Sequence, residues 1–170
     1  MASRLDSLIW TPSPEEISNE RRWIKNESNQ IGLEVLEELA KKAKAARELT
    51  YSPYSGYGVG AALLGISGNV KLGMNIEIAS YSETGHAEED AIKAMVGDGE
   101  VQKNGRRFIK AIAISHEGDT APCGRCRQIL LEFCDNAIVV VADIGGEIRR
   151  ITSMGILLPY AFKPTDLGKE

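Results

Sequence analysis

Two short, uninterrupted apolar runs limit what this chain can fold into. Residues 109–115 and 137–142 consist almost entirely of apolar residues, and runs of this length fit strands that are buried on both faces. Each run follows a segment with helical periodicity, 86–95 and 125–133. Because such strands need helices on either side, the sequence predicts an α/β fold with three layers, α/β/α. The expected packed side of the first helix is Ala87, Ala91, Ala94 and Met95.

The region before these runs predicts another helix and a hairpin. Residues 32–49 carry apolar residues every three to four positions with lysines between them, as in an amphipathic helix. The segment 51–56, YSPYSG, ends that helix because Pro and Gly do not continue it. Residues 59–64 and 70–74 indicate two strands joined by the turn residues 67–69, which makes a mixed sheet. The residues expected on the helix's packed side are Leu33, Leu36, Leu39, Ala40, Ala43 and Ala46.

Size and charge exclude some classes of function. A chain of 170 residues can bury one sizeable core but is too short for two ordinary domains. Its 43% hydrophobic and 26% charged residues are ordinary for a soluble globular protein. The formal net charge of -4 argues against a nucleic-acid partner, because a general phosphate-backbone binder needs a basic face. A small ligand without phosphate is not excluded.

Residues 1–29 differ from the rest of the chain. They are polar and have no clean period, so we expect an N-terminal extension, partly ordered or forming a short surface helix, before a folded domain at 30–170. Partner binding by Trp10 and Trp23 is the alternative. No apolar run follows the short tip at 8–10, and no stretch of 18 apolar residues occurs anywhere. We therefore expect no signal peptide, no membrane partner and a cytoplasmic location.

The three cysteines separate into a pair and a single residue. An odd number without a secretory signal disfavours a disulfide framework. Cys123 and Cys126 follow Pro122 in a C-x-x-C motif, and such a short turn brings both sulfurs to one side, where they can hold one metal ion. Cys134 lies at the end of an apolar helical segment, and we expect it to be a buried thiol.

His86-Ala87-Glu88 supplies the second half of a candidate metal site. The His86 imidazole would be a third ligand, and three protein ligands leave a fourth tetrahedral position open, as in catalytic zinc sites. Both halves are expected at helix N-termini, where the helix dipole favours thiolates. Glu88 could move a proton without binding the metal. A redox pair or a structural zinc site would explain the C-x-x-C motif but would not need Glu88.

The H-x-E and P-C-x-x-C spacing is the signature of zinc-dependent base deaminases, and four blocks in order resemble the small cytidine deaminases. The resemblance covers about residues 30 to 167, and the four blocks are YSPYSGYGVGAALL (51–64), MNIEIASY (74–81), PCGRCRQ (122–128) and LLPYAFKPTDL (157–167). It implies a cytidine-deaminase fold, Zn²⁺ as cofactor, and hydrolysis of cytidine or deoxycytidine to uridine or deoxyuridine and ammonia in pyrimidine salvage. A homotetramer, or else a dimer, is implied too.

The resemblance also implies roles at the substrate. Asn75 and Glu77, which share one face of a strand, would bind the ribose hydroxyls. Tyr57 would be the aromatic ring near the base. Phe162 would stack on the pyrimidine from a neighbouring subunit. Glu88 would be the catalytic acid and base, and backbone groups around Ala87 and Cys123 would help to hold the tetrahedral intermediate.

Two positions depart from the usual pattern of short-chain members, which have cysteine in place of His86 and arginine in place of Glu89. Three thiolates around Zn²⁺ leave a net charge of about -1 that an adjacent arginine can offset, whereas one histidine and two thiolates leave the site neutral. We infer that the arginine was lost because the histidine is present, and that Arg125 could be the compensating cation. These departures keep open a modified cytosine nucleoside or an aminonucleoside antibiotic as substrate. The acidic balance disfavours a polynucleotide-editing deaminase.

Overall fold

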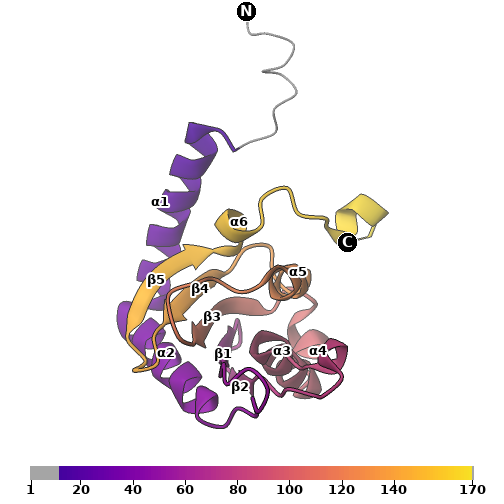
Figure 1. Ribbon diagram of the computed structural model, residues 1–170. Helices are drawn as coiled ribbons and strands as arrows, with labels where there is room; N and C mark the ends of the chain where they lie inside the picture. The colour runs from indigo at the N-terminus through magenta and orange to yellow at the C-terminus, as the bar shows by residue number, and fades with distance from the viewer. Residues whose placement is uncertain (1–11, 170) are drawn as a thin grey trace, which may run out of the picture.

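The computed structural model describes residues 12–169 and, within them, one five-stranded sheet between helical layers (Figure 1). Its strand order is β2-β1-β3-β4-β5. Strands β3 and β4 are parallel, and the other neighbouring pairs are antiparallel. The predicted mixed sheet and the hairpin of β1 and β2 are confirmed. The strands are β1 (Gly60–Gly65), β2 (Val70–Met74), β3 (Ile109–Ser115), β4 (Ile138–Ala142) and β5 (Ile148–Ser153).

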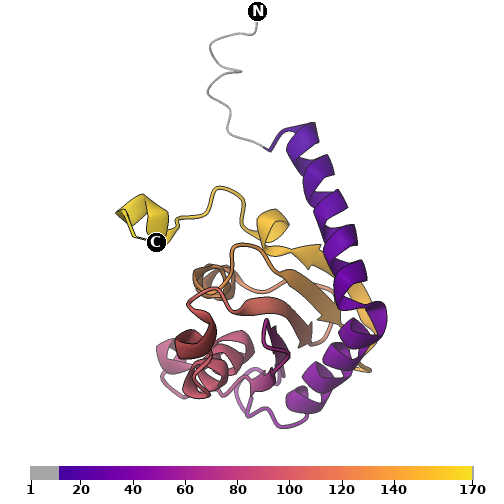
Figure 2. The ribbon, with the colours of Figure 1, turned by 180° about the vertical axis from the view of Figure 1, so that it is seen from behind.

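Helices α1 (Pro14–Ile31) and α2 (Leu33–Arg47) cover one face of the sheet (Figure 2). The predicted packed side of α2 is buried, except that Leu33 at its first position is exposed. Gly60 lets α2 approach β1 closely, because a Cβ there would lie 2.1 Å from the carbonyl oxygen of Ala43. Helix and strand therefore meet backbone to backbone.

The other face carries α3 (Ala87–Gly97), α4 (Glu100–Asn104), α5 (Gly124–Glu132) and α6 (Met154–Leu157). Together the two helical layers confirm the α/β/α prediction. In α3, Ile92 is buried, whereas Ala94 is only half-buried, so the packed side is rotated slightly from the predicted one. The core on this face is built mainly from Leu63, Met95, Phe108, Ile112, Ile114, Leu130 and Val139.

The C-terminal region contains regular structure that the hydrophobic pattern of the sequence does not predict. It includes β5, α6 and the 3₁₀ turn Pro164–Leu167; helix α4 and the 3₁₀ turn Tyr81–Glu83 were not predicted either. Strand β5 lies at the edge of the sheet and exposes Arg149 and Arg150. Charged residues are common on edge strands because they discourage pairing with other chains. They also remove the apolar alternation by which a strand is identified.

The N-terminal region forms a longer helix than predicted. Ser13 and Glu16 make a capping box at the start of α1, and Pro14 follows the cap, so this end has the residues that begin helices. Trp23 packs against the core beneath the helix, which gives it a structural role. Trp10 lies outside the described residues. Within residues 12–169 no helix is long and apolar enough to span a membrane.

Candidate active site

The three predicted metal ligands lie together. His86 is the N-cap of α3, Cys123 is the N-cap of α5, and Cys126 lies in the first turn of α5. The Nδ1 atom of His86 lies 3.5 Å from Sγ of Cys123 and 3.3 Å from Sγ of Cys126, and all three ligand atoms lie within 4.8 Å of one another. Such separations suit atoms that surround one ion at about 2.0–2.3 Å. One imidazole and two thiols are also a donor set that zinc prefers.

The fold brings these two helix ends together by close packing. A Cβ on Gly73 of β2 would lie 2.1 Å from the carbonyl oxygen of Ala87, so the first turn of α3 rests directly on the hairpin. Helix α5 begins just after the loop that leaves β3, and it packs beside α3. The first turn of α3 is therefore fixed by the hairpin, and α5 is positioned by its packing beside α3.

An ion pair also joins the two helices. Arg125 Nη2 lies 2.7 Å from Glu89 Oε2, and Lys93 Nζ lies 2.8 Å from Glu89 Oε1. The hydrogen bond from Lys93, with the charges of Lys93 and Arg125, lowers the pKa of Glu89. Arg125 was expected to compensate the metal site, but its ion pair is with Glu89, the carboxylate that replaces the usual arginine. The guanidinium of Arg125 therefore pairs with a carboxylate on the neighbouring helix.

A cavity of about 380 Å³ is lined by two of the three predicted ligands, His86 and Cys123. This volume lies within the range of small-molecule sites, about 300–1,000 Å³. Its lining includes most of the predicted site residues, namely Tyr57, Asn75, Glu77, His86, Ala87, Glu88 and Cys123. Helix ends α3 and α5 form one part of the wall, and the segments around β2 and residues 55–59 form the other.

Glu88 is one of two buried carboxylates that line this cavity; the other is Glu77. Glu88 lies in the first turn of α3 and is only 5% exposed.

Burial, followed by the charges of Glu88 and Cys123, raises the pKa of the Cys126 thiol. Because cysteine binds a metal as a thiolate, metal binding would release the proton of Cys126.

Asn75 faces the cavity and also holds its rim. Its Oδ1 accepts a hydrogen bond from the backbone N–H of Val59 at 2.8 Å, and its Nδ2 donates to the carbonyl oxygen of Tyr57 at 2.9 Å. The side chain is buried at 9% exposure. The Nδ2 group carries a second hydrogen that the bond to Tyr57 does not use.

Glu77 binds the turn that follows α2. Its Oε2 accepts hydrogen bonds from the backbone N–H groups of Tyr54 at 2.9 Å and Ser55 at 3.1 Å, and the Ser55 hydroxyl donates to Oε1. The hydroxyl of Ser55 is the largest cause that lowers the pKa of Glu77. The carboxylate therefore stays ionised and holds Ser55 in the cavity wall.

Phe162 and Cys134 lie away from the cavity. Phe162 is 60% exposed, does not line the cavity, and its carbonyl oxygen accepts a hydrogen bond from Gln128 Nε2 at 2.9 Å. Within one chain the structure does not bring Phe162 to the predicted metal ligands.

Cys134 is buried as predicted. Its Sγ donates to the carbonyl oxygen of Leu130, and burial raises the pKa of its thiol to about 12.

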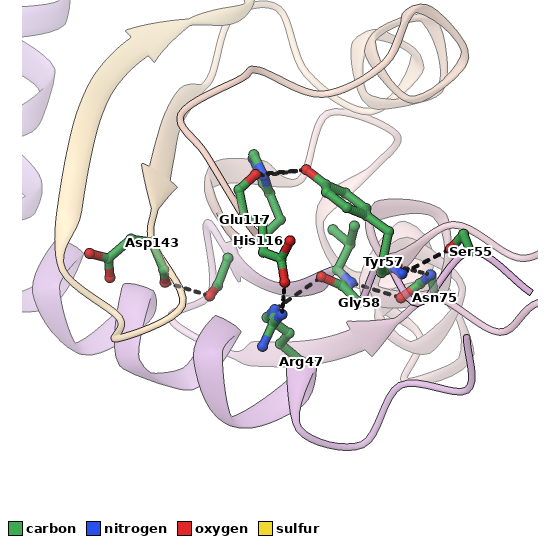
Figure 3. A network of polar contacts seen from close by, with 10 residues as sticks. Arg47, Ser55, Tyr57, Gly58, Asn75, His116, Glu117 and Asp143 are labelled. Carbon is green, nitrogen blue, oxygen red and sulfur yellow. Dashed lines mark hydrogen bonds and ion pairs between the residues drawn. The ribbon is translucent and has the colours of Figure 1, made fainter. Parts of the chain in front are cut away.

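Sequence reasoning missed His116, which lines the cavity and is 3% exposed. Its Nδ1 lies 2.7 Å from the Tyr57 hydroxyl (Figure 3). Its signal in the sequence is slight: it is one of two histidines and directly follows a buried strand, β3. Ser55, Thr84 and Thr120 also line the cavity without having been predicted.

Comparison with known proteins identifies relatives over the region that contains this site. Residues 33–142 match the family described as the cytidine and deoxycytidylate deaminase zinc-binding region. The chain is 42% identical over 136 residues to the cytidine deaminase of Sporosarcina psychrophila, covering 78% of this chain and 95% of that protein. It is 41% identical over 133 residues to the cytidine deaminase of Halalkalibacterium halodurans, covering 76% and 96%.

Solved structures give the same result. The crystal structure of cytidine deaminase from Burkholderia pseudomallei matches with a TM-score of 0.67 and 41% identity, over 74% of this chain and 97% of that one. The crystal structure of cytidine deaminase from Mycobacterium tuberculosis matches with a TM-score of 0.62 and 35% identity, over 74% and 94%.

Proposed function

Because this chain belongs to the cytidine and deoxycytidylate deaminase family, we propose that the cavity beside His86 is the active site in which it deaminates cytidine. The chain is a zinc-dependent enzyme that converts cytidine to uridine and ammonia. The observation that carries the assignment of the site is the cluster of three ligand atoms within 4.8 Å at the edge of a cavity that also holds the buried Glu88.

We propose that Zn²⁺ is held by Nδ1 of His86 and the sulfurs of Cys123 and Cys126. The orientation of the imidazole supports this set, because Nδ1 faces both sulfurs. Zinc, when bound there, supplies a Lewis acid that makes water a stronger nucleophile at neutral pH. The cysteines must bind as thiolates, and the N-terminal end of α5 favours that charge.

We propose that Glu88 carries the proton. It takes one proton from the attacking water and delivers it to the ring nitrogen of cytosine. It then takes the remaining proton from the new hydroxyl group on C4 and gives it to the leaving amino group, so that the C4–N bond breaks, C4=O forms and ammonia departs. Its burial in the first turn of α3 supports this role, because a carboxylate shielded from solvent transfers protons to the substrate rather than to bulk water. Ala87 and Cys123 line the cavity beside it, and their backbone groups would hold the tetrahedral intermediate.

The nucleoside would lie along the other wall of the cavity. We propose that Asn75 and Glu77 bind the ribose hydroxyls, that Tyr57 forms the wall near the base, and that deoxycytidine is accepted as well. Both Asn75 and Glu77 line the cavity, and their other hydrogen bonds fix them to the surrounding backbone. A site with fixed polar groups discriminates strongly between ligands that satisfy them and ligands that do not.

The assembly and location are proposed on the same premise. Phe162 is exposed and lies outside the cavity of its own chain, so we propose that it reaches the base in a neighbouring copy, within a homotetramer or a dimer. The enzyme would act in the cytoplasm. Residues 1–29 would be an extension of a catalytic domain at 30–170; the family match begins at residue 33, which supports that division.

Replacing Glu88 with Gln tests the proton transfer. The amide keeps the size of the side chain but cannot take up a proton, so kcat for cytidine should fall by about 10²–10⁴ while zinc stays bound. The loss of cytidine absorbance at ultraviolet wavelengths measures turnover, and metal analysis measures zinc. The matched control is Glu83→Gln, which changes an exposed carboxylate outside the cavity and should leave kcat unchanged.

Two outcomes would contradict the proposal in different ways. Turnover by the Glu88→Gln enzyme at the wild-type rate would remove Glu88 from the mechanism. A zinc-loaded wild-type enzyme that turned over neither cytidine nor deoxycytidine would point instead to a modified cytosine nucleoside as the substrate.

A further inference from the structure

His116 is a buried histidine whose two ring nitrogens both have partners. Nε2 lies 2.8 Å from the carbonyl oxygen of Thr120. Nδ1 lies 2.7 Å from the carbonyl oxygen of Glu117 and 2.7 Å from the hydroxyl of Tyr57, which also donates to that carbonyl at 2.9 Å. The imidazole thus touches two separate parts of the cavity wall, and both Tyr57 and Thr120 line the cavity.

The chemistry of these partners determines which ring nitrogen of His116 donates a hydrogen bond and which can accept one. A carbonyl oxygen only accepts hydrogen bonds, so Nε2 must carry a proton and donate to Thr120. In the neutral ring, Nδ1 then accepts a hydrogen bond from the Tyr57 hydroxyl. In the charged ring, Nδ1 donates to Glu117 and the Tyr57 hydroxyl donates to the same carbonyl. In both states the hydroxyl of Tyr57 keeps a hydrogen-bond partner at this point of the cavity wall.

The second contact reaches toward the metal ligands. Thr120 lies three residues before Cys123, and all of residues 120–123 line the cavity. A hydrogen bond to the Thr120 carbonyl therefore restrains the loop that delivers the first cysteine. Through one ring, His116 connects the aromatic wall on one side of the cavity to the cysteine loop on the other.

Helix α2 supports the same network through Arg47 (Figure 3). Arg47 Nε donates to the carbonyl oxygen of Gly58 at 3.0 Å, next to Tyr57. Arg47 Nη2 lies 3.6 Å from Glu117 Oε1, next to His116. One guanidinium thus contacts the segment next to Tyr57 and the segment next to His116. Helix α2 itself packs on the sheet.

We propose that His116 is a positioning residue that sets the distance between Tyr57 and the cysteine loop, and so sets both the fit of the nucleoside and the hold on the metal. The proposal rests on the proposed function. It assigns two separable effects to the two ring nitrogens: Nδ1 acts through Tyr57 on substrate binding, and Nε2 acts through Thr120 on Cys123.

Two substitutions separate these effects. In His116→Gln the side-chain amide can reach the position of Nε2 and keep Thr120, but it loses Tyr57. We expect KM for cytidine and Kd for uridine to rise by roughly 2- to 10-fold, as for one net hydrogen bond, with kcat and zinc retention little changed. In His116→Asn the amide can reach the position of Nδ1 but loses Thr120. We expect faster zinc loss to a chelator, and a smaller change in KM.

A double-mutant cycle tests the route through Tyr57. Tyr57→Phe removes only the hydroxyl, so its effect on Kd for uridine should be non-additive with His116→Gln, because both remove the same contact. The chain has only two histidines, so the ¹⁵N resonances of the rings are simple to assign. Tyr57→Phe should shift the Nδ1 resonance of His116 and leave that of His86 in place.

Ser115→Ala is the matched control. Ser115 precedes His116, is fully buried, and donates to the carbonyl oxygen of Asp143 at 2.7 Å, away from the cavity. Its loss should lower the melting temperature without changing KM or zinc retention. If Gln and Asn at position 116 behave alike, if their effects match the control, or if the cycle is additive, the proposal is wrong. Wild-type protein without cytidine turnover would instead contradict the proposed function.

Discussion

The two walls of the cavity are built by different means. The metal side, with His86, Glu88 and Cys123, consists of side chains in the first residues of two helices that pack on the sheet. The proposed nucleoside side, with Glu77 and Tyr57, consists of side chains whose polar atoms are bonded to other segments of the chain. The predicted ligands of the metal side therefore lie in two short sequence motifs, whereas the residues of the nucleoside side are held by individual hydrogen bonds to other segments. Changes on the first should affect kcat, and changes on the second should affect binding.

Removing zinc should give the largest effect and should separate the two walls. Because a metal Lewis acid contributes several kcal/mol to the transition state, we expect kcat to fall by about 10³ or more after chelation. None of the three proposed metal ligands belongs to the proposed nucleoside side, so Kd for uridine should rise far less. Equilibrium binding and turnover on one zinc-depleted sample check this, and added Zn²⁺ should restore kcat. Equal losses in kcat and uridine affinity would show that the walls are not independent.

Replacing Glu77 should give an intermediate effect, concentrated in binding. Its carboxylate accepts hydrogen bonds from the backbone of Tyr54 and Ser55, and bonds to a charged group are worth about 1.5–3 kcal/mol. For Glu77→Gln we expect kcat/KM for cytidine to fall by about 10- to 100-fold, mostly through KM. Glu83→Gln is the exposed control. A loss confined to kcat would instead group Glu77 with the residues of the metal side.

The same carboxylate gives a pH dependence with a definite sign. Hydrogen bonding by Ser55 lowers the pKa of Glu77 below its usual value of about 4.3. Its contribution to binding should therefore be complete above that usual value and should be lost only as the pH falls through the lowered pKa of the folded protein. Binding of uridine measured from pH 7 to pH 4 should show little loss from this residue. A loss centred near pH 6 would come from another group.

The ion pair of Glu89 and Arg125 should give the smallest effect. The guanidinium is 48% exposed, and such pairs contribute about 0.2–1 kcal/mol. Each single substitution by Ala should lower the melting temperature slightly, by different amounts because Glu89 also binds Lys93. The double variant should be less destabilised than the sum. A coupling near zero in thermal unfolding would show that the pair does not link the two helices.

The difference between the walls also explains what could be predicted from the sequence. Strand β3 was predicted with its observed bounds because burial on both faces leaves an uninterrupted apolar run. The cluster of His86 with Cys123 and Cys126 was predicted because the ligands lie in two short motifs. Their roles as ligands, and the role of Glu88, stay predictions until the experiments above are done.

The nucleoside wall was predicted only in part, for a physical reason. His116 contacts Tyr57 across 59 positions of sequence, and its other partners are backbone carbonyls, which every residue has. No residue pattern marks such a contact. Strand β5 was missed for another reason: it is an edge strand whose outward arginines interrupt the apolar pattern.

The contact between Gly73 and Ala87 has a mechanical consequence. With no side chain between strand β2 and the first turn of α3, no rotamer can yield when either element is displaced. We expect a shift of the hairpin to be transmitted to Glu88, which follows Ala87 in the same helix. Asn75, two residues beyond Gly73, moves with the same strand end. The proposed proton carrier and a proposed ribose contact thus lie next to two main-chain segments that are in direct contact.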